Sequence, residues 1–213
     1  VNELLQNTDD SQGRELVFAM EGEQLVITHD GRHFNQTDVE KIISFSNQDF
    51  RDKSLNAQMT GYKGIGFKAL LSLTARVHII SGGYSFRFDK AYWKEHSHKM
   101  PWQMIPIWTE LDRKKRASPQ QVTFIFHLTQ PAFIAKEFDL FLKEPRSTLF
   151  LRHIRKITFE YKQKKAVVER KDAGPDRALI SPSNTSSWLV ISKKISVPQD
   201  LHVAVQGINS TIC

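Results

Sequence analysis

The 213-residue chain has very little cysteine and no long apolar run. Its single cysteine, Cys213, excludes a disulfide framework and a zinc site built from several cysteines, so we expect a reducing, cytoplasmic compartment. Ten glycines and eight prolines exclude collagen-like and low-complexity classes. The apolar runs, such as residues 69–71, are all too short to cross a bilayer, so no membrane partner is expected.

Acidic residues are also comparatively few. The chain has 30 Lys and Arg against 23 Asp and Glu, a formal charge of +7. This balance suits an anionic partner such as a nucleotide or a nucleic acid, but a fragment separated from an acidic remainder would show it too. The chain opens at Val1 inside a helical pattern and stops at Cys213, so we expect an excised piece of a larger polypeptide.

Hydrophobic periodicity predicts an α/β protein. Thr37 and Glu40 match a capping box that would open one of the helices. A turn is expected at Gln163 and Lys164, and irregular structure over 45–60, 89–119 and 172–186. The predicted helices are 1–10, 37–44, 67–73 and 133–143, and the predicted strands are 15–20, 24–29, 77–81, 84–88, 121–128, 157–161, 166–170, 188–192 and 201–205.

The opening helix carries a first candidate site. Glu3 and Asn7 are four residues apart and therefore share one helix face. An Asn oxygen is a reasonable single protein ligand for Mg²⁺, and a nearby carboxylate can orient or deprotonate a water. The alternative is that both side chains simply solvate the helix.

A second candidate is the glycine-rich segment of Gly61, Gly64 and Gly66, which leads into a helix through Phe67 and Lys68. Glycines allow close approach of the backbone to a ligand, and a helix N-terminus favours an anion. The spacing matches neither the dinucleotide fingerprint nor the P-loop. A glycine-rich helix start without a ligand is the alternative.

A third candidate is His29-Asp30-Gly31, at the end of an apolar strand. A buried acceptor here would be able to take the exocyclic amine of a purine, whereas the plainer interpretation is an Asp-Gly turn. The polar loop 45–60 is long enough for a lid. The basic run 113–116 is interpreted mainly as a solvated loop, with nucleic-acid contact as a weaker alternative.

Taken in order, these segments resemble the GHKL superfamily of ATP-binding domains over about residues 1–160, closest to its sacsin-type and heat-shock-chaperone-type members. ELLQNTDD at 3–10 is similar to the first box of that family, and GYKGIGFKALLSLTARVHIISG at 61–82 to its glycine box. The pair Val122-Thr123 resembles a later family strand that carries a threonine, and 133–161 the end of a sacsin-type domain.

The resemblance implies a two-layer α/β sandwich, the Bergerat fold, with a mostly antiparallel mixed sheet and helices on one face. Residues 1–160 would form this ATP-binding domain, and 161–213 a β-rich extension or the start of another domain. By the same resemblance Asn7 would hold Mg²⁺, Glu3 would activate water and Asp10 would support the nucleotide. The implied phosphate-binding residues are Gly61, Gly64, Gly66, Phe67 and Lys68, and Thr123 would lie near the adenine.

One position departs from the family pattern. His29 stands where the family has the aspartate that binds the adenine amine, and Asp30 and Gly31 follow it. The expected function is a Mg²⁺-dependent ATP-binding module, a slow ATPase within a chaperone-like or defence-like protein, with a homodimer as an open alternative. Two other functions stay open: a nucleotide switch without turnover, and a basic interaction module that has lost its ligand.

Overall fold

The computed structural model describes residues 1–43, 71–96, 102–103, 105–110, 120–172, 177–181, 187–189, 191–193 and 210–212. Its helices are α1 (Asn2–Asp10), α2 (Gln36–Ile43), α5 (Lys90–His96), α6 (Pro131–Lys143) and the short 3₁₀ helix η2 (Pro145–Phe150). Its strands are β1 (Glu15–Glu21), β2 (Gln24–His29), β3 (Thr74–Ser81), β4 (Tyr84–Asp89), β5 (Ile107–Trp108), β6 (Val122–Leu128), β7 (Lys156–Tyr161), β8 (Lys164–Asp172), β9 (Arg177–Ser181), β10 (Ser187–Leu189), β11 (Ile191–Lys193) and β12 (Ser210–Ile212).

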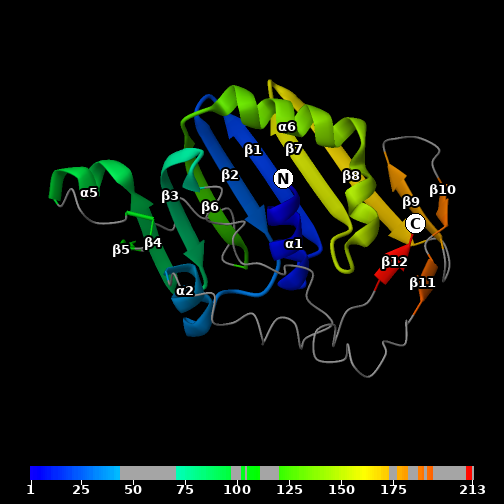
Figure 1. The fold of residues 1–213 in the computed structure, drawn as a ribbon, viewed down its shortest axis with the longest axis horizontal. Helices are drawn as coiled ribbons and strands as arrows, with labels where there is room; N and C mark the ends of the chain where they lie inside the picture. The colour runs from blue at the N-terminus through cyan, green and yellow to red at the C-terminus, as the bar shows by residue number, and fades with distance from the viewer. Residues whose placement is uncertain are drawn as a thin grey trace, which may run out of the picture.

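Ten of these strands form one sheet in the order β10-β9-β8-β7-β1-β2-β6-β3-β4-β5 (Figure 1). Neighbouring strands are antiparallel except at β1 and β7, which pair in parallel. The sheet is open, with β10 and β5 at its two edges, and β11 and β12 form a separate pair. The predicted class, an α/β protein with a mostly antiparallel mixed sheet, is therefore confirmed.

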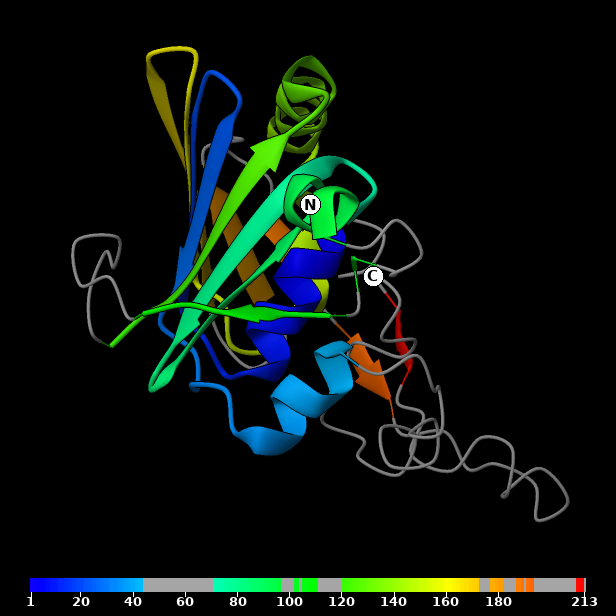
Figure 2. The same cartoon turned by 90° about the vertical axis from the view of Figure 1, so that its left-hand side faces the viewer.

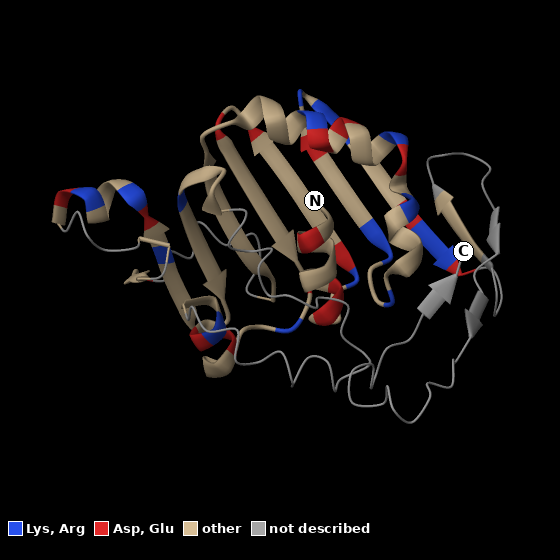
Figure 3. Ribbon diagram, viewed as in Figure 1, with Lys and Arg blue, Asp and Glu red and all other residues tan. Residues whose placement is uncertain are grey.

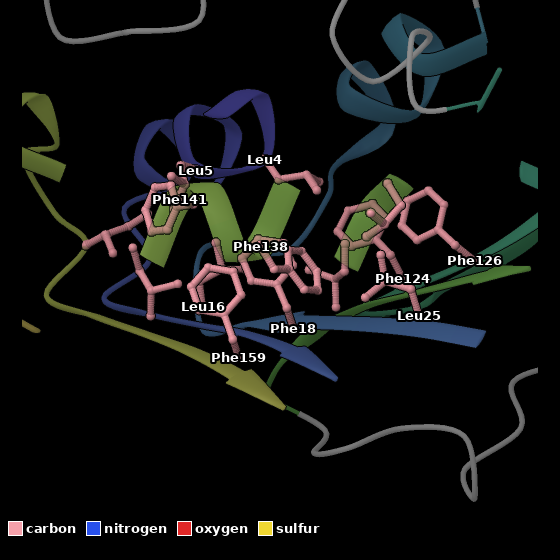
Figure 4. Close-up of a cluster of buried hydrophobic side chains, with 14 of the residues drawn as sticks. Leu4, Leu5, Leu16, Phe18, Leu25, Phe124, Phe126, Phe138, Phe141 and Phe159 are labelled. Atoms are coloured by element: carbon pink, nitrogen blue, oxygen red, sulfur yellow. The ribbon is translucent and has the colours of Figure 1, made fainter. Parts of the chain in front are cut away.

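The core lies between one face of this sheet and the helices α1 and α6 (Figures 1 and 4). Phe18 on β1 stacks on Phe159 of β7, with 5.0 Å between ring centroids. Phe138 of α6 packs edge-on against Phe159 at the same distance. Burying a phenylalanine contributes about 1.5–3 kcal/mol, so this cluster fixes α6 on the sheet.

Strand register tells which residues share the helix-covered face. Side chains alternate between the two faces along a strand. Phe18 pairs with Ile27, and Ile27 pairs with Phe124. Two residues further along, Leu16 pairs with His29 and His29 pairs with Val122. The side chains of His29 and Val122 therefore project to the same face as the phenylalanine core, at the end of β2.

Tight turns connect the hairpins where the backbone can take positive φ. Gly22 joins β1 to β2 at φ 56°, and Gly82 joins β3 to β4 at φ 58°. The hairpin β7–β8 turns at Lys162 and Gln163, with φ of 51° and 58°, one residue earlier than predicted. Lys164 already belongs to β8, where it pairs with Tyr161.

The cap of α2 differs from the expected Thr37–Glu40 box. The helix begins at Gln36, so Asn35 is its N-cap. Asn35 Oδ1 accepts the Asp38 backbone N–H at 2.9 Å, and Asp38 Oδ2 accepts the Asn35 N–H at 2.9 Å. Asn35 and Asp38 thus make the reciprocal bonds that were predicted for Thr37 and Glu40, two residues nearer the N-terminus. Asp38 also holds Arg32, which favours this choice of cap.

Three elements, α5, β5 and β9, fall in segments predicted to be irregular, so those predictions were wrong there. Helix α5 is capped by Asp89, whose Oδ1 accepts the Tyr92 N–H at 3.2 Å. Strand β9 lies inside the expected loop 172–186 and pairs with β8, for example Leu179 with Lys171. These elements depend on pairing with another strand, as β5 does with β4, or on a short cap, and hydrophobic periodicity detects neither. The strand predicted at 201–205 and most of the helix predicted at 67–73 lie outside the described residues.

The predicted β-rich extension continues the main sheet. Residue 160 lies inside β7, and the hairpin partner β8 follows at once. Strands β8, β9 and β10 then extend the same sheet outward from β7. In the part of the chain that the structure describes, no helix is both long and apolar enough to cross a membrane.

Candidate functional site

Helix α1 separates a buried face from an exposed one. Leu4 and Leu5 are buried against the sheet and α6 (Figure 4). Glu3 and Asn7 lie together on the exposed face, as the sequence predicts, and Asp10 follows three residues after Asn7. Neither Glu3 nor Asn7 makes a side-chain hydrogen bond to another described residue, so their oxygens are available to a ligand.

The C-terminal end of α1 rests on the turn that follows β2. The Ser11 carbonyl accepts the Arg32 backbone N–H at 2.8 Å. Gly31 packs so closely beneath Ser11 that a Cβ at this position would overlap the serine hydroxyl. The structure therefore joins the C-terminal end of α1, the helix that carries Glu3 and Asn7, to the His29–Gly31 turn.

His29 is buried on the helix-covered face, with 5% of its surface exposed, and stacks on Phe124 at 6.1 Å between centroids. Its Nδ1 accepts the Gly31 backbone N–H at 3.1 Å. Burial lowers the pKa of His29 to about 4, an effect that Asp30 opposes and His33 reinforces. The ring is neutral at pH 7, and because Nδ1 is an acceptor, its proton lies on Nε2.

Asp30 stabilises the turn after β2 by hydrogen bonds to the start of β1. Its Oδ1 accepts the backbone N–H groups of Arg14 and Glu15 at 2.7 and 2.8 Å. These bonds tie the turn after β2 to the start of β1. The carboxylate thus stabilises the turn that carries His29 and Gly31, in line with the plainer Asp-Gly interpretation.

Thr123 is not brought to this site. It pairs with Thr28 on β2 and Ile80 on β3, so its side chain projects from the sheet face opposite to α1. Its Oγ1 is buried, and none of the described residues makes a hydrogen bond to it. The residue on the helix-covered face beside His29 is Val122. A shift of one residue along a strand exchanges the two faces, and the sequence pair Val-Thr did not reveal which member faces the helices.

The glycine-rich candidate cannot be placed. Its residues lie outside the described residues, as does the predicted lid 45–60. The roles of Gly61, Gly64, Gly66, Phe67 and Lys68 stay predictions.

Asp9 is a buried acid that the sequence analysis did not single out. It is 1% exposed, and its Oδ1 accepts the backbone N–H groups of His153 and Ile154 at 2.7 and 3.1 Å. Its Oδ2 accepts the Arg152 N–H at 3.0 Å. These bonds join α1 to the segment that enters β7. The only sequence signal is an acid on the apolar side of an amphipathic helix.

Positive charge on the β7–β8 hairpin is largely compensated where the structure describes it (Figure 3). Its basic side chains alternate with acids rather than forming a patch of one sign, and each exposed pair contributes about 0–1 kcal/mol. The pairs are Lys156–Glu15, Lys162–Asp139, Lys165–Glu160, Arg155–Asp172 and Lys171–Glu169. The basic run 113–116 lies outside the described ranges.

The described residues contain no group of three or more His, Cys, Asp or Glu side chains arranged to hold a metal ion. A magnesium ion bound with a nucleotide needs no such group, because waters and phosphate oxygens fill most of its coordination. The exposed carboxamide of Asn7 with the carboxylate of Glu3 on the same face fits this donor set.

No protein-family model matches the chain, and neither does any curated protein sequence. The likeness to GHKL domains therefore depends on the sequence segments quoted above alone.

The burial of His29 predicts a pH-dependent stability. The unfolded chain takes up a proton on this ring below about pH 6.5, whereas the folded protein does so only below about 4. The unfolded state thus binds more protons in this window, and the free energy of unfolding should fall by about 3 kcal/mol as pH drops through it. Chemical denaturation at a series of pH values measures this.

His29→Asn is the matched control for this prediction. An asparagine Oδ1 can accept the Gly31 N–H in place of Nδ1, but it does not titrate. His127, whose pKa is lowered by burial and by Arg76, contributes equally to both proteins. Parallel pH profiles for the wild type and the variant would show that His29 is not the titrating group.

Proposed function

We propose that the chain is a Mg²⁺-dependent module that binds a purine nucleoside triphosphate and hydrolyses it slowly. ATP is the nucleotide that the resemblance implies. The fold would be the two-layer Bergerat sandwich, and the module would serve a larger chaperone-like or defence-like protein of the cytoplasm. The observation that carries this proposal is the docking of α1 onto the Asp30–Gly31 turn through Ser11.

This docking matters because it connects the helix that carries Glu3 and Asn7 to the turn that carries His29. The exposed face of α1 offers oxygen ligands for a metal and for a water. The turn after β2 carries a buried ring and a close-packed glycine, and Val122 and Phe124 are buried beside them. Figure 2 shows α1 and α2 on the same side of the sheet, and the proposed ligand would bind on this side.

In this proposal each residue of α1 has a distinct role. The Asn7 carboxamide oxygen would ligate Mg²⁺, which when bound neutralises phosphate charge. Glu3 would accept a proton from the attacking water. Asp10, three residues beyond Asn7, would support the nucleotide from the end of the helix. Thr123 has no role, since it projects from the other face of the sheet.

A thermal-stability measurement tests the function directly. A ligand that binds only the folded state at a hundredfold excess over its dissociation constant stabilises it by about 2.7 kcal/mol. We expect Mg²⁺ with a purine triphosphate to raise the melting temperature, and triphosphate with EDTA to raise it much less. No shift with any triphosphate would leave only the basic interaction module.

Turnover should be slow, below the common enzyme range of ~1–10³ s⁻¹. An arginine that stabilises the transferring phosphoryl group is worth about 10³–10⁵ in rate. Arg32 is the arginine of the His29 turn, but its guanidinium is held by both carboxylate oxygens of Asp38, with Nη2 to Oδ1 at 3.1 Å. Glu3→Gln should reduce the already low rate at least tenfold and leave binding unchanged. A phosphate-release assay beside a binding titration measures both.

Asn2→Ala is the control, because it changes an exposed side chain on the same helix. Rapid turnover by the wild type would contradict the proposed mechanism, as would equal rates for the wild type and Glu3→Gln. Binding without any phosphate release would instead support the nucleotide switch.

A further inference from the structure

Helix α6 exposes apolar side chains on the face that it turns away from the core. Phe138 and Phe141 are buried against the sheet, whereas Phe133 and Leu140, seven residues apart, lie on the outer face of the helix. These two residues are 46% and 49% exposed. Figures 1 and 2 show α6 along the upper end of the sheet, where its outer face is open to a partner. Single exposed apolar residues are ordinary on surfaces, but two on one helix face form a stripe.

Charged residues flank this apolar stripe in a repeated order. At 3.6 residues per turn, the residue three positions after an apolar one lies on one side of the stripe, and the residue four positions after it lies on the other side. Both apolar residues are followed by Lys at the first of these positions and by Glu at the second. The two sets are Phe133, Lys136 and Glu137, then Leu140, Lys143 and Glu144. One flank of the stripe is therefore basic and the other acidic.

Most of these flanking charges lack a close partner within the chain. None of the described residues forms an ion pair with Lys136, Glu137 or Lys143, whereas Glu144 pairs with Arg146 just beyond the helix. The flanks thus differ from the β7–β8 hairpin, whose basic side chains are largely paired. They are available to a partner that carries the complementary order of charges.

A second copy of the chain has this complementary order when the two helices run parallel. In a parallel pair related by a two-fold axis, the basic flank of each helix faces the acidic flank of the other. In an antiparallel pair the two basic flanks would face each other, as would the two acidic flanks, and like charges in such positions are destabilising. The parallel pair also brings Phe133 and Leu140 against their own copies along one apolar seam.

We propose that the chain forms a symmetric homodimer through the outer faces of two parallel α6 helices. The helix has 13 residues and is therefore about 20 Å long, so the contact is at the low end of interface sizes and the dimer is weak and transient. This inference is independent of the proposed function, because it uses none of the candidate nucleotide-site residues.

Sedimentation velocity at a series of protein concentrations up to about 1 mM tests the inference. We expect the wild type to pass from monomer to dimer over this series. Phe133→Ala and Leu140→Ala should each weaken self-association about tenfold or more, because each removes apolar contact area from both copies. Lys94→Glu, an exposed charge change on α5, is the control and should dimerise like the wild type.

Two double variants test the parallel arrangement. The acidic variant combines Lys136→Glu with Lys143→Glu, and the basic variant combines Glu137→Lys with Glu144→Lys. Each variant alone places like charges against each other at both flanks, so each should self-associate less than the wild type. A one-to-one mixture of the two should associate again, because an acidic helix then meets a basic one. Circular dichroism checks that every variant is folded.

Each outcome bears on the proposal. Wild-type protein that stays monomeric throughout the series overturns it. Self-association that is unchanged in both Phe133→Ala and Leu140→Ala overturns α6 as the interface. Equal self-association of the wild type and the two charge variants overturns the parallel arrangement, because an antiparallel pair has like charges at both flanks already. A mixture of the charge variants that remains monomeric overturns the role of the flanks.

Discussion

Asp9→Ala should destabilise the fold by about 3 kcal/mol or more, the largest effect that we expect from a single substitution on α1. The carboxylate accepts three backbone N–H groups, from Arg152, His153 and Ile154, and the alanine accepts none. A buried donor left unpaired costs about 1–3 kcal/mol, and the Ile154 N–H is fully buried. Since whole domains have only about 5–15 kcal/mol of stability, chemical denaturation will show the loss clearly.

Asp9→Asn and Glu21→Ala serve as the comparison variants. Asn keeps one acceptor oxygen for the His153 and Ile154 N–H groups, so its destabilisation should be intermediate. Glu21→Ala removes a carboxylate from the exposed end of β1 and should change stability by about 0.5 kcal/mol or less. Equal stability of Asp9→Ala and Glu21→Ala would refute the assignment of Asp9 as the link between α1 and β7.

Asn7→Ala should lower the affinity for Mg²⁺–triphosphate about 100-fold or beyond detection and leave the fold intact. Loss of residues that only support metal ligands already costs 10–100-fold in metal affinity, and Asn7 is proposed as the ligand itself. The side chain is exposed and makes no hydrogen bond to a described residue, so no packing is lost. Alanine is also the better helix former, so stability should not fall.

Calorimetric titration with Mg²⁺–ATP and Mg²⁺–GTP measures this effect, and the same titrations with EDTA isolate the metal-dependent part. Asn2→Ala, an exposed carboxamide deleted from the first residue of the same helix, should bind like the wild type. Affinity for the Mg²⁺ complexes that is unchanged in Asn7→Ala would remove the metal role from Asn7. It would also leave Glu3 without a neighbouring metal site.

Local patterns in the sequence were sufficient for much of the architecture. The hairpins β1–β2 and β3–β4, the strand β6 and the helices α1 and α6 were all predicted close to their observed bounds. These elements have clear apolar periodicity and turns that their residues favour, such as Gly22 and Gly82 at positive φ. The shared face of Glu3 and Asn7 likewise follows from helical spacing alone.

Contacts between distant segments decided the rest. Strand β9 pairs with β8 although its composition is that of a loop, and Asp9 is a buried acceptor only because residues 152–154 come to it. The face on which Thr123 lies depends on its register with Thr28 and Ile80, which no local pattern encodes. His29 is a donor because its other nitrogen is taken by Gly31 in the folded turn. Spacing in the sequence determines which side chains share an element, but only tertiary packing determines what each of them faces, because the partners that bury or bond it come from elsewhere in the chain.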